Sequence, residues 1–416
     1  MSNENQHIPS GYKLSPLGPI PEDWEVKRLG EVCDIDKESL SNKTDPNYEF
    51  DYISLSDVDS DCFETTTSKQ TFRTAPSRAR RIVKQGDVII STVRPNLQAF
   101  TLIKDKVNDL IVSTGFADLT PLRLNGEYLY QYVFSQPITK QFYQLVVGSN
   151  YPAVNSSDVF HLKIAVPPLP EQQRIVSVLS LGDTAIAKQT ALIEKLTLRK
   201  RGLMQQLLTG KKRLEGFSGE WKNIKLGSVA DRITRKNEED NKNVVTISAQ
   251  RGFVVQTDFF NKSVASEILD NYYLVHKDEF CYNKSYSNGY PMGAIKRLKS
   301  FDKAVVTTLY ICLRLKEKPK TNIDFFEQYS ESGLLNKELV KVANEGGRAH
   351  GLLNVTPDDF FNMHMNVPSI EEQTAIASVL VNADKEIELA NKKLARLQEE
   401  KRGLMQVLLT GKKRVK

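Results

Sequence analysis

The sequence predicts a mixed α/β (α+β) protein with a pseudo-twofold internal repeat, in which two globular bodies are separated by two long antiparallel coiled-coil helices. Three observations predict this fold class. The chain matches itself at an offset of 201 residues, each copy closes with a heptad pattern of apolar residues, and strand-like and helix-like runs precede each closing segment. Two long copies are typical of pseudo-twofold symmetry, whereas a solenoid needs three or more short ones.

The closing part of each copy is the most similar. The string KRGLMQQLLTG at Lys200–Gly210 returns as KRGLMQVLLTG at Lys401–Gly411, and Lys-Lys-Arg follows both strings. Residues 167–213 align with residues 368–414 without a gap, and 23 of these 47 positions are identical. The two closing segments are therefore expected to share one structure.

Each copy also opens in a similar way. EDWEVKRLGEVCD at Glu22–Asp34 resembles GEWKNIKLGSVAD at Gly219–Asp231, and the only two tryptophans of the chain coincide there, where we expect them to anchor the structure. The predicted divisions are an N-terminal tail (1–23), a first body (24–166), a central long helix (167–213), a second body (214–366) and a C-terminal long helix (367–416).

The composition indicates a soluble globular protein with room for two or three cores, since 40% of the 416 residues are hydrophobic. No apolar run reaches 18 residues, so we expect no membrane span, and the N-terminus lacks the apolar region of a secretory signal. The four cysteines form no C-x-x-C pair, which favours a reducing cytoplasm over metal binding. A net charge of +6 permits nucleic-acid binding without requiring it.

Each closing segment is predicted to be one long helix. Proline and acidic or amide residues open it, in PPLPEQQ at Pro167–Gln173 and in VPSIEEQ at Val367–Gln373. Proline suits the first turn, and carboxylates favour the positive end of the helix dipole. Gly210 and Gly411 can end the two helices as left-handed capping residues.

Apolar residues recur every 3.5 positions along both predicted helices, with few interruptions over about four heptads, which is typical of a coiled coil. An antiparallel pair would bury the two stripes, here called the seam, against each other. The alternative is that each stripe covers the core of its own body. The seam residues are Leu179, Ile186, Ile193, Leu196, Leu203 and Leu207 in the first helix and Leu380, Ile387, Leu394, Leu397, Leu404 and Leu408 in the second.

The divergent middles read as α/β bodies, because β-branched and aromatic runs alternate with short helical patterns. The strand-like runs are Gly86–Val93, Leu110–Leu119, Asn243–Ala249 and Ala304–Leu315, and the predicted short helices are Glu127–Ser135 and Phe325–Ser332. The middles differ in sequence but share this outline, which is the pattern expected of two readers of two different targets.

Basic residues cluster once in each middle. FRTAPSRARRIVK at Phe72–Lys84 contains no acid, and YNKSYSNGYPMGAIKRLK at Tyr282–Lys299 interleaves cations with tyrosines. Phosphate contact needs such cations, and base-edge readout needs Arg, Lys, Asn or Gln. The alternative is a solvated charged face. The candidate DNA-contacting residues are Arg73, Arg78, Arg80, Arg81, Lys84 and Arg94 in the first body and Lys284, Tyr286, Lys296 and Arg297 in the second.

Sequence motifs for catalysis are missing. There is no G-x-x-x-x-G-K-[ST] phosphate loop and no H-E-x-x-H, and the five histidines form no metal-binding pattern. The string DPNY at Asp45–Tyr48 resembles an amino-methyltransferase motif, but Asp-Pro-Asn is typical of a turn. We therefore expect no catalytic and no metal site in this chain.

Three strings, PLPEQQRIVSVL, KRGLMQQLLTGKKR and GDVIISTVRPN, together with the repeat architecture, resemble the specificity (S) subunit, HsdS, of Type I restriction–modification systems. The resemblance covers nearly the whole chain. It implies that each divergent middle is a target recognition domain that reads one half of a split sequence in double-stranded DNA. It also implies that the long helices form an antiparallel coiled coil.

The resemblance further implies partners that carry the chemistry. Two methyltransferase (M) subunits would dock on the chain and supply S-adenosylmethionine and catalysis of adenine methylation. Separate restriction (R) subunits would supply cleavage driven by ATP and magnesium. The chain itself would hold no cofactor and no active site, and the repeated helix sequence would offer equivalent docking faces to the two M subunits, since a twofold arrangement needs the same surface twice.

Two functions of other classes remain open at this point. One is a catalytic DNA-modifying enzyme, a nuclease or methyltransferase with an unrecognised site, and methyl transfer by this chain alone would support it. The other is a coiled-coil scaffold that binds no nucleic acid, which a salt-dependent DNA-binding assay would separate from a DNA reader.

Overall fold

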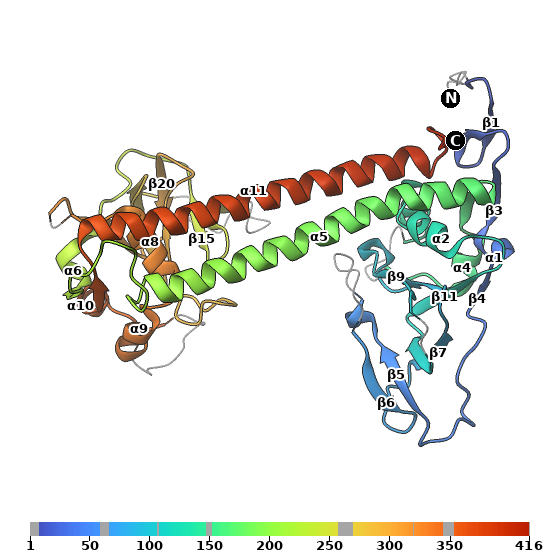
Figure 1. Cartoon of the computed structure of the whole chain (residues 1–416), viewed down its shortest axis with the longest axis horizontal. Helices are drawn as coiled ribbons and strands as arrows, with labels where there is room; N and C mark the ends of the chain where they lie inside the picture. Colours follow the sequence, from blue (N-terminus) through green and yellow to red (C-terminus); the bar gives the residue numbers. More distant parts are fainter. Residues whose placement is uncertain are drawn as a thin grey trace. The chain divides into compact units, whose positions relative to one another are not determined.

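The chain divides into two compact units (Figure 1). The computed structural model describes residues 8–58, 66–105, 108–146, 152–256, 269–318, 320–343 and 353–415; Cys62 lies outside them. Unit 1 comprises Met1–Gln189 and Lys393–Lys416, and unit 2 comprises Thr190–Lys392. Unit 1 is therefore discontinuous in sequence, because the end of the chain belongs with its beginning.

Unit 1 contains two four-stranded sheets and two two-stranded ones among its described residues. Their strand orders are β6-β5-β10-β7, β4-β11-β8-β9, β1-β2 and β12-β3. The strands are β1 (Tyr12–Ser15), β2 (Gly18–Pro21), β3 (Glu25–Arg28), β4 (Cys33–Ile35), β5 (Glu49–Ile53), β6 (Ser68–Thr71), β7 (Ala79–Val83), β8 (Val88–Ser91), β9 (Phe100–Leu102), β10 (Leu110–Ser113), β11 (Phe116–Pro121) and β12 (Lys163–Val166). The short helices are α1 (Leu29–Val32), α2 (Gly126–Val133), α3 (Gln136–Val146), α4 (Ser156–His161) and the 3-10 turns η1 (Leu55–Asp57) and η2 (Pro95–Leu97).

Unit 2 contains one four-stranded sheet, β14-β21-β18-β19, and three two-stranded ones, β13-β22, β15-β16 and β17-β20, in the part of it that the structure describes. The strands are β13 (Lys222–Lys225), β14 (Ala230–Ile233), β15 (Val245–Ser248), β16 (Gly252–Val255), β17 (Tyr273–His276), β18 (Phe280–Asn283), β19 (Ala294–Arg297), β20 (Lys303–Val306), β21 (Ile311–Leu315) and β22 (His364–Val367). The short helices are α6 (Leu226–Val229), α8 (Ile323–Glu331), α9 (Asn336–Val342) and α10 (Pro357–Asn362).

The two units share one framework despite their different sequences. The sheet β4-β11-β8-β9 of unit 1 has the same strand order as β14-β21-β18-β19 of unit 2, and each pairing is antiparallel. In both units, the first strand of the similar opening segment pairs with the last strand before the long helix, β3 with β12 and β13 with β22. The internal repeat and the mixed α/β class are confirmed.

Each framework is held by its own apolar core. The core of unit 1 includes Trp24, Tyr128 and Tyr132, all fully buried, and the core of unit 2 includes Phe325 and Phe360. The Trp24 indole N–H donates to a carboxylate at the start of the first long helix, Glu171, at 3.0 Å. Burial of such large aromatic groups, at about 25 cal/mol per Å² of apolar surface, dominates the stability of domains this size.

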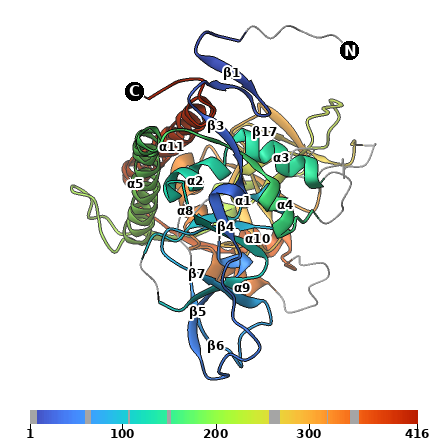
Figure 2. The ribbon, with the colours of Figure 1, turned by 90° about the vertical axis from the view of Figure 1, so that its right-hand side faces the viewer.

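The closing segments form two helices of 39 residues, α5 (Leu169–Leu207) and α11 (Ile370–Leu408), which lie side by side (Figure 2). They are antiparallel, because residues later in α5 contact residues earlier in α11. In unit 1, Lys401 forms an ion pair with Asp183, and in unit 2, Lys200 forms one with Asp384. Gly210 and Gly411 follow the helices with φ of 68° and 71°, the left-handed conformation expected of capping glycines.

The seam follows the heptad pattern along most of both helices. Between Ile186 and Lys200 of α5, only the residues at seam spacing are buried or half-buried, and all the others are exposed. Leu404 differs, because its side chain is 39% exposed while the next residue, Met405, is buried in the core of unit 1. The stripe therefore shifts by one residue where α11 packs on the globular core of unit 1. Among the described residues, no helix has the length and apolar character of a membrane span.

Candidate nucleic-acid interface

Equivalent loops of the two frameworks carry exposed polar groups and unusual backbone. In unit 1 the loop joins β8 to β9, and in unit 2 it joins β18 to β19. These hairpins occupy the same place in sheets of the same strand order, although their loop sequences, TVRPNLQA and KSYSNGYPMG, share no pattern. A fixed frame with variable loops is the arrangement by which scaffolds usually carry recognition residues.

In unit 1, two non-glycine residues of this loop adopt the left-handed conformation. Arg94 has φ 50° and ψ 54°, and Gln98 has φ 53° and ψ 36°, one on each side of η2. The Arg94 N–H donates to the Pro152 carbonyl at 2.7 Å, and the Gln98 amide donates to Thr139 at 3.0 Å. Left-handed backbone costs about 1–2 kcal/mol for a residue with a Cβ atom, so the loop is held by its surroundings in a shape that leaves Arg94 exposed.

In unit 2, glycines and a neighbouring hairpin shape the equivalent loop. Gly293 has φ 74°, and an added Cβ atom would lie 2.3 Å from the Asn283 carbonyl oxygen, so only glycine fits there. The Gln250 amide, in the turn between β15 and β16, donates to the Asn288 carbonyl at 3.0 Å. The loop presents Tyr286, whose side chain is 69% exposed, and an exposed aromatic ring of this kind can stack on a base or pack on a sugar.

Two arginines of the first basic segment are available for phosphate contact. Arg73 and Arg78 are exposed, and within the described ranges no carboxylate contacts either guanidinium. Arg80 is half-buried, with its guanidinium 4.5 Å from the centre of the Phe72 ring and a hydrogen bond to the Ala79 carbonyl. This stacking fixes the direction of Arg80 while leaving most of its donors unused.

The other cations of this segment are neutralised locally. The Arg81 guanidinium pairs with Asp36 and keeps only 13% of its side chain exposed, and Lys84 pairs with Glu38. Beside them, burial raises the pKa of the Asp118 carboxyl to about 8, with further repulsion from Asp87 and Asp36. The positive charge of Arg81 therefore compensates the acidic side chains around Asp118. We leave Arg81 out of the candidate interface because its guanidinium is already paired.

Comparison with known proteins matches both units. The family model of the Type I restriction modification DNA specificity domain matches residues 21–198 and again residues 218–399. The chain belongs to this family. A putative type I restriction enzyme MjaX specificity subunit of Methanocaldococcus jannaschii is 26% identical, over 97% of each chain. The type I restriction enzyme MjaVIII specificity subunit of the same organism is 24% identical, over 95% of this chain and 94% of the relative.

Solved structures show the same fold. A chain described under "Structural basis underlying complex assembly and conformational transition of the type I R-M system" aligns with a TM-score of 0.59 and 23% identity, over 94% of this chain and 99% of that one. The S subunit of a Type-I restriction-modification system from M. genitalium aligns with a TM-score of 0.52 and 16% identity, over 93% and 96% of the two chains.

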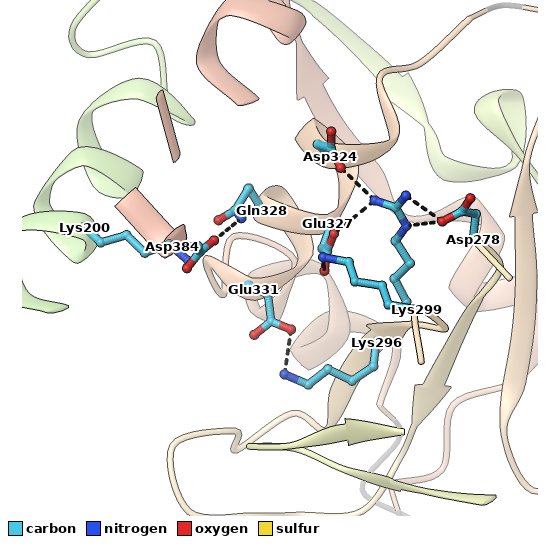
Figure 3. A network of polar contacts seen from close by, with 10 residues as sticks. Lys200, Asp278, Lys296, Lys299, Asp324, Glu327, Gln328, Glu331 and Asp384 are labelled. Carbon is cyan, nitrogen blue, oxygen red and sulfur yellow. Dashed lines mark hydrogen bonds and ion pairs between the residues drawn. The ribbon is translucent and has the colours of Figure 1, made fainter. Parts of the chain in front are cut away.

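The second specificity domain uses two of its predicted DNA-contacting cations internally (Figure 3). Lys296 is 8% exposed and pairs with Glu331 of α8 at 2.6 Å. Arg297, with a side chain 12% exposed, contacts three carboxylates, which are those of Asp278, Asp324 and Glu327. Ion pairs of this kind fasten β19 to α8, so we leave Lys296 and Arg297 out of the candidate interface and retain Lys284 and Tyr286.

Sequence reasoning also missed polar residues of these specificity domains. Asn96, two residues after Arg94, and the pair Gln250 and Asn288 are exposed around the two loops, and amides of this type can read base edges. The signal for Gln250 was the string AQRG between two runs of strand-favouring residues, which is typical of a hairpin turn. Within the described ranges, no three His, Cys, Asp or Glu side chains group so as to hold a metal ion.

Proposed function

We propose that this chain is the DNA target recognition subunit of a Type I restriction–modification system, and that it reads a bipartite target with one specificity domain per half. The observation that carries the proposal is the duplication of one framework with two different loops between equivalent strands. Identical readers would need identical loops, whereas a split asymmetric target needs two different ones. The exposed Arg, Asn and Tyr side chains of the two loops, with Gln250 beside the second loop, suit phosphate contact and base readout.

Membership of the family implies that the chain works with DNA and with methyltransferase and restriction subunits. We further propose that two methyltransferase subunits bind, one on each copy of the repeat, and that they carry S-adenosylmethionine and methylate adenine. The restriction subunits would carry ATP and magnesium. The chain itself would act in the cytoplasm as a non-catalytic reader.

The test is to co-express the chain with the methyltransferase subunit of the same system and to map modified bases by methylome sequencing. We expect one split motif, with a modified adenine in each half and an unspecified spacer between them. Absence of any modified motif, or methyl transfer by this chain without the methyltransferase subunit, would contradict the proposal.

A domain exchange tests the bipartite part separately. Residues 24–166 would be replaced by the equivalent body of a relative, with both long helices kept. The methylated motif should change in one half only, because each unit has its own core. A change in both halves would show that the two domains do not read independently.

A further inference from the structure

A small apolar pocket lies beside the loop that joins β8 to β9 in unit 1. It is formed where η2 packs against α3, and its apolar walls are Pro95 of η2 and Phe142, Tyr143 and Val146 of α3. Nearly all of the surface that faces the pocket is apolar. The centre of a water-sized group has about 10 Å³ in which to move, so the pocket has room for one such group.

The surrounding structure holds the pocket in one shape. The Gln98 amide, on one side of it, donates to the Thr139 hydroxyl at 3.0 Å and thereby ties η2 to α3. The ring of Phe142 lies 5.9 Å from that of Phe100, and both rings are buried in the core of unit 1. The pocket is therefore preformed, and the left-handed backbone of Gln98 belongs to its frame.

The empty pocket does not stabilise the fold. Side chains that line an empty space lose the dispersion contacts that a filled space would give them. A water molecule needs about two to four polar partners, which apolar walls do not supply. A strained turn kept around such a space suits the binding of a group from outside the chain.

The surroundings of the pocket are polar. Asn96 also lines it and is exposed, and Arg94 is exposed two residues earlier. On α3, the neighbouring Lys140 and Gln144 are exposed as well. An apolar pocket for one small group, surrounded by side chains suited to phosphates and base edges, fits a ligand that presents a single apolar group on a polar and negatively charged surface.

The major groove of DNA presents this combination. Its base edges consist of hydrogen-bond donors and acceptors, and the one apolar group among them is the C5-methyl group of thymine. A methyl group is close to a water molecule in size, so the pocket can accept it. Cytosine has no such group and would leave the pocket empty.

We propose that this pocket, here called the methyl pocket, receives the C5-methyl group of one thymine in the half-site that unit 1 reads, while Asn96 at its rim contacts a neighbouring base edge. The inference rests on the proposed function and adds to it a base and the residues that select it. Unit 1 should then prefer a T·A pair at one position of its half-site, because of the shape of the pocket and not because of charge.

The test uses duplexes of the mapped target in which each thymine of the half-site assigned to unit 1 by the domain exchange is replaced in turn by deoxyuridine. Deoxyuridine pairs as thymine does and lacks only the methyl group. The full chain, assembled with the methyltransferase subunit, is titrated onto each duplex, and the dissociation constant is measured by fluorescence anisotropy. One replacement should weaken binding about fourfold, the factor expected from one buried methyl group.

Two variants test whether the methyl pocket makes this contact. Val146 is half-buried at the end of α3, so Val146→Phe should fill the pocket and bind the thymine and deoxyuridine duplexes equally. Tyr143→Ala, at a side chain 55% exposed, removes one wall and should also bring the ratio of the two dissociation constants close to one. The matched control is Leu145→Phe, at an exposed residue of the same helix outside the pocket lining, which should keep the fourfold ratio.

A fourfold effect that both pocket variants abolish and the control keeps would support the inference. If Val146→Phe lowers the melting temperature, Tyr143→Ala decides, since its side chain is exposed. The inference would be overturned if no replacement weakened binding, or if the weakening persisted in folded Tyr143→Ala, because the methyl group would then be read elsewhere or not at all. Both results leave the proposed function intact. Failure of the unaltered assembly to bind the mapped duplex would overturn the proposed function itself, and the inference with it.

Discussion

The ion pair between Lys401 and Asp183 should stabilise unit 1 more than its repeat-related counterpart stabilises unit 2. In unit 1, Lys401 Nζ lies 2.5 Å from Asp183 Oδ1, the side chains are 13% and 20% exposed, and Gln131 donates to the other carboxylate oxygen at 2.7 Å. The stem of Lys401 also packs beside Gly182. Lys401→Met keeps most of this packing and removes the charge together with the hydrogen bond that Lys401 donates to Asp183.

The expected cost follows from the burial of the carboxylate that is left behind. Lys401→Met leaves Asp183 mostly buried with one hydrogen bond, so we expect a loss of about 2–3 kcal/mol, below the roughly 3–5 kcal/mol seen for fully buried pairs. Asp384, the partner of Lys200 in unit 2, is 43% exposed and can be solvated. Lys200→Met should therefore cost about 1 kcal/mol.

The two tryptophans allow each unit to be followed separately. Trp24 is fully buried in unit 1, so in a Trp221→Phe background its fluorescence reports urea unfolding of that unit. Trp221 reports unit 2 in a Trp24→Phe background. Lys393→Met, at an exposed lysine of the unit 1 part of α11, is the control and should change stability by less than about 0.5 kcal/mol. The reasoning would be refuted if Lys401→Met cost no more than this control, or less than Lys200→Met.

Three further predictions concern charge, DNA binding and helix length. Burial raises the pKa of Asp118 to about 8, so the folded state keeps a proton that the unfolded state loses above about pH 4. The stability of unit 1 should then fall as pH rises from about 5 to 8, by up to about 1.4 kcal/mol per pH unit, and Asp118→Asn should flatten this dependence in pH-resolved unfolding. Arg73→Ala with Arg78→Ala should reduce the log–log salt slope of DNA binding by about 0.9 for each phosphate that the variant no longer neutralises, and an unchanged slope in the folded variant would show a solvated face only. Insertion of one heptad after Gln189 keeps the seam in phase and adds about 10 Å of helix, so the methylated motif should gain about three base pairs of spacer; methylation at the original spacer alone would show that α5 does not measure the gap.

The long helices could be predicted closely because their signal is periodic and repeated. The first long helix, Leu169–Leu207, begins within the predicted opening string Pro167–Gln173 and ends three residues before the predicted capping residue, Gly210. The prediction that Leu404 lies in the seam was wrong, because a heptad pattern describes the pairing of two helices. It does not describe the packing of a helix end on a globular body.

Within the bodies, long β-branched runs concealed turns. Leu110–Leu119 forms β10 and β11, which belong to different sheets and are separated by a turn at Gly115. Ala304–Leu315 likewise forms β20 and β21. A run of strand-favouring residues shows the propensity of each position but not where the chain reverses.

The candidate interface could be predicted less well, because charge in a sequence does not reveal its partner. In the sequence, Arg297 belongs to a segment that interleaves cations with tyrosines. The three acids that contact it in space come from other segments, the turn before β18 and the helix α8. Arg73 and Arg78 lie outside the adjoining strand, β7, whose ends are its buried residues, Ala79 and Val83. The equivalence of the two hairpin loops became visible only through strand order, since it depends on pairing between distant segments.

The discontinuity of unit 1 has a consequence for biosynthesis. Its core includes Leu408 and Leu409, Arg414 closes on Asp23 and Glu171, and the Tyr12 hydroxyl donates to the Gly411 carbonyl at 2.8 Å. A ribosome that makes roughly 5–20 residues per second thus completes every residue of unit 2 before the last ones that unit 1 requires. The part of the protein translated first is the last to be able to finish folding, so a premature stop codon within the final turns of α11 would damage the amino-terminal reader and spare the other.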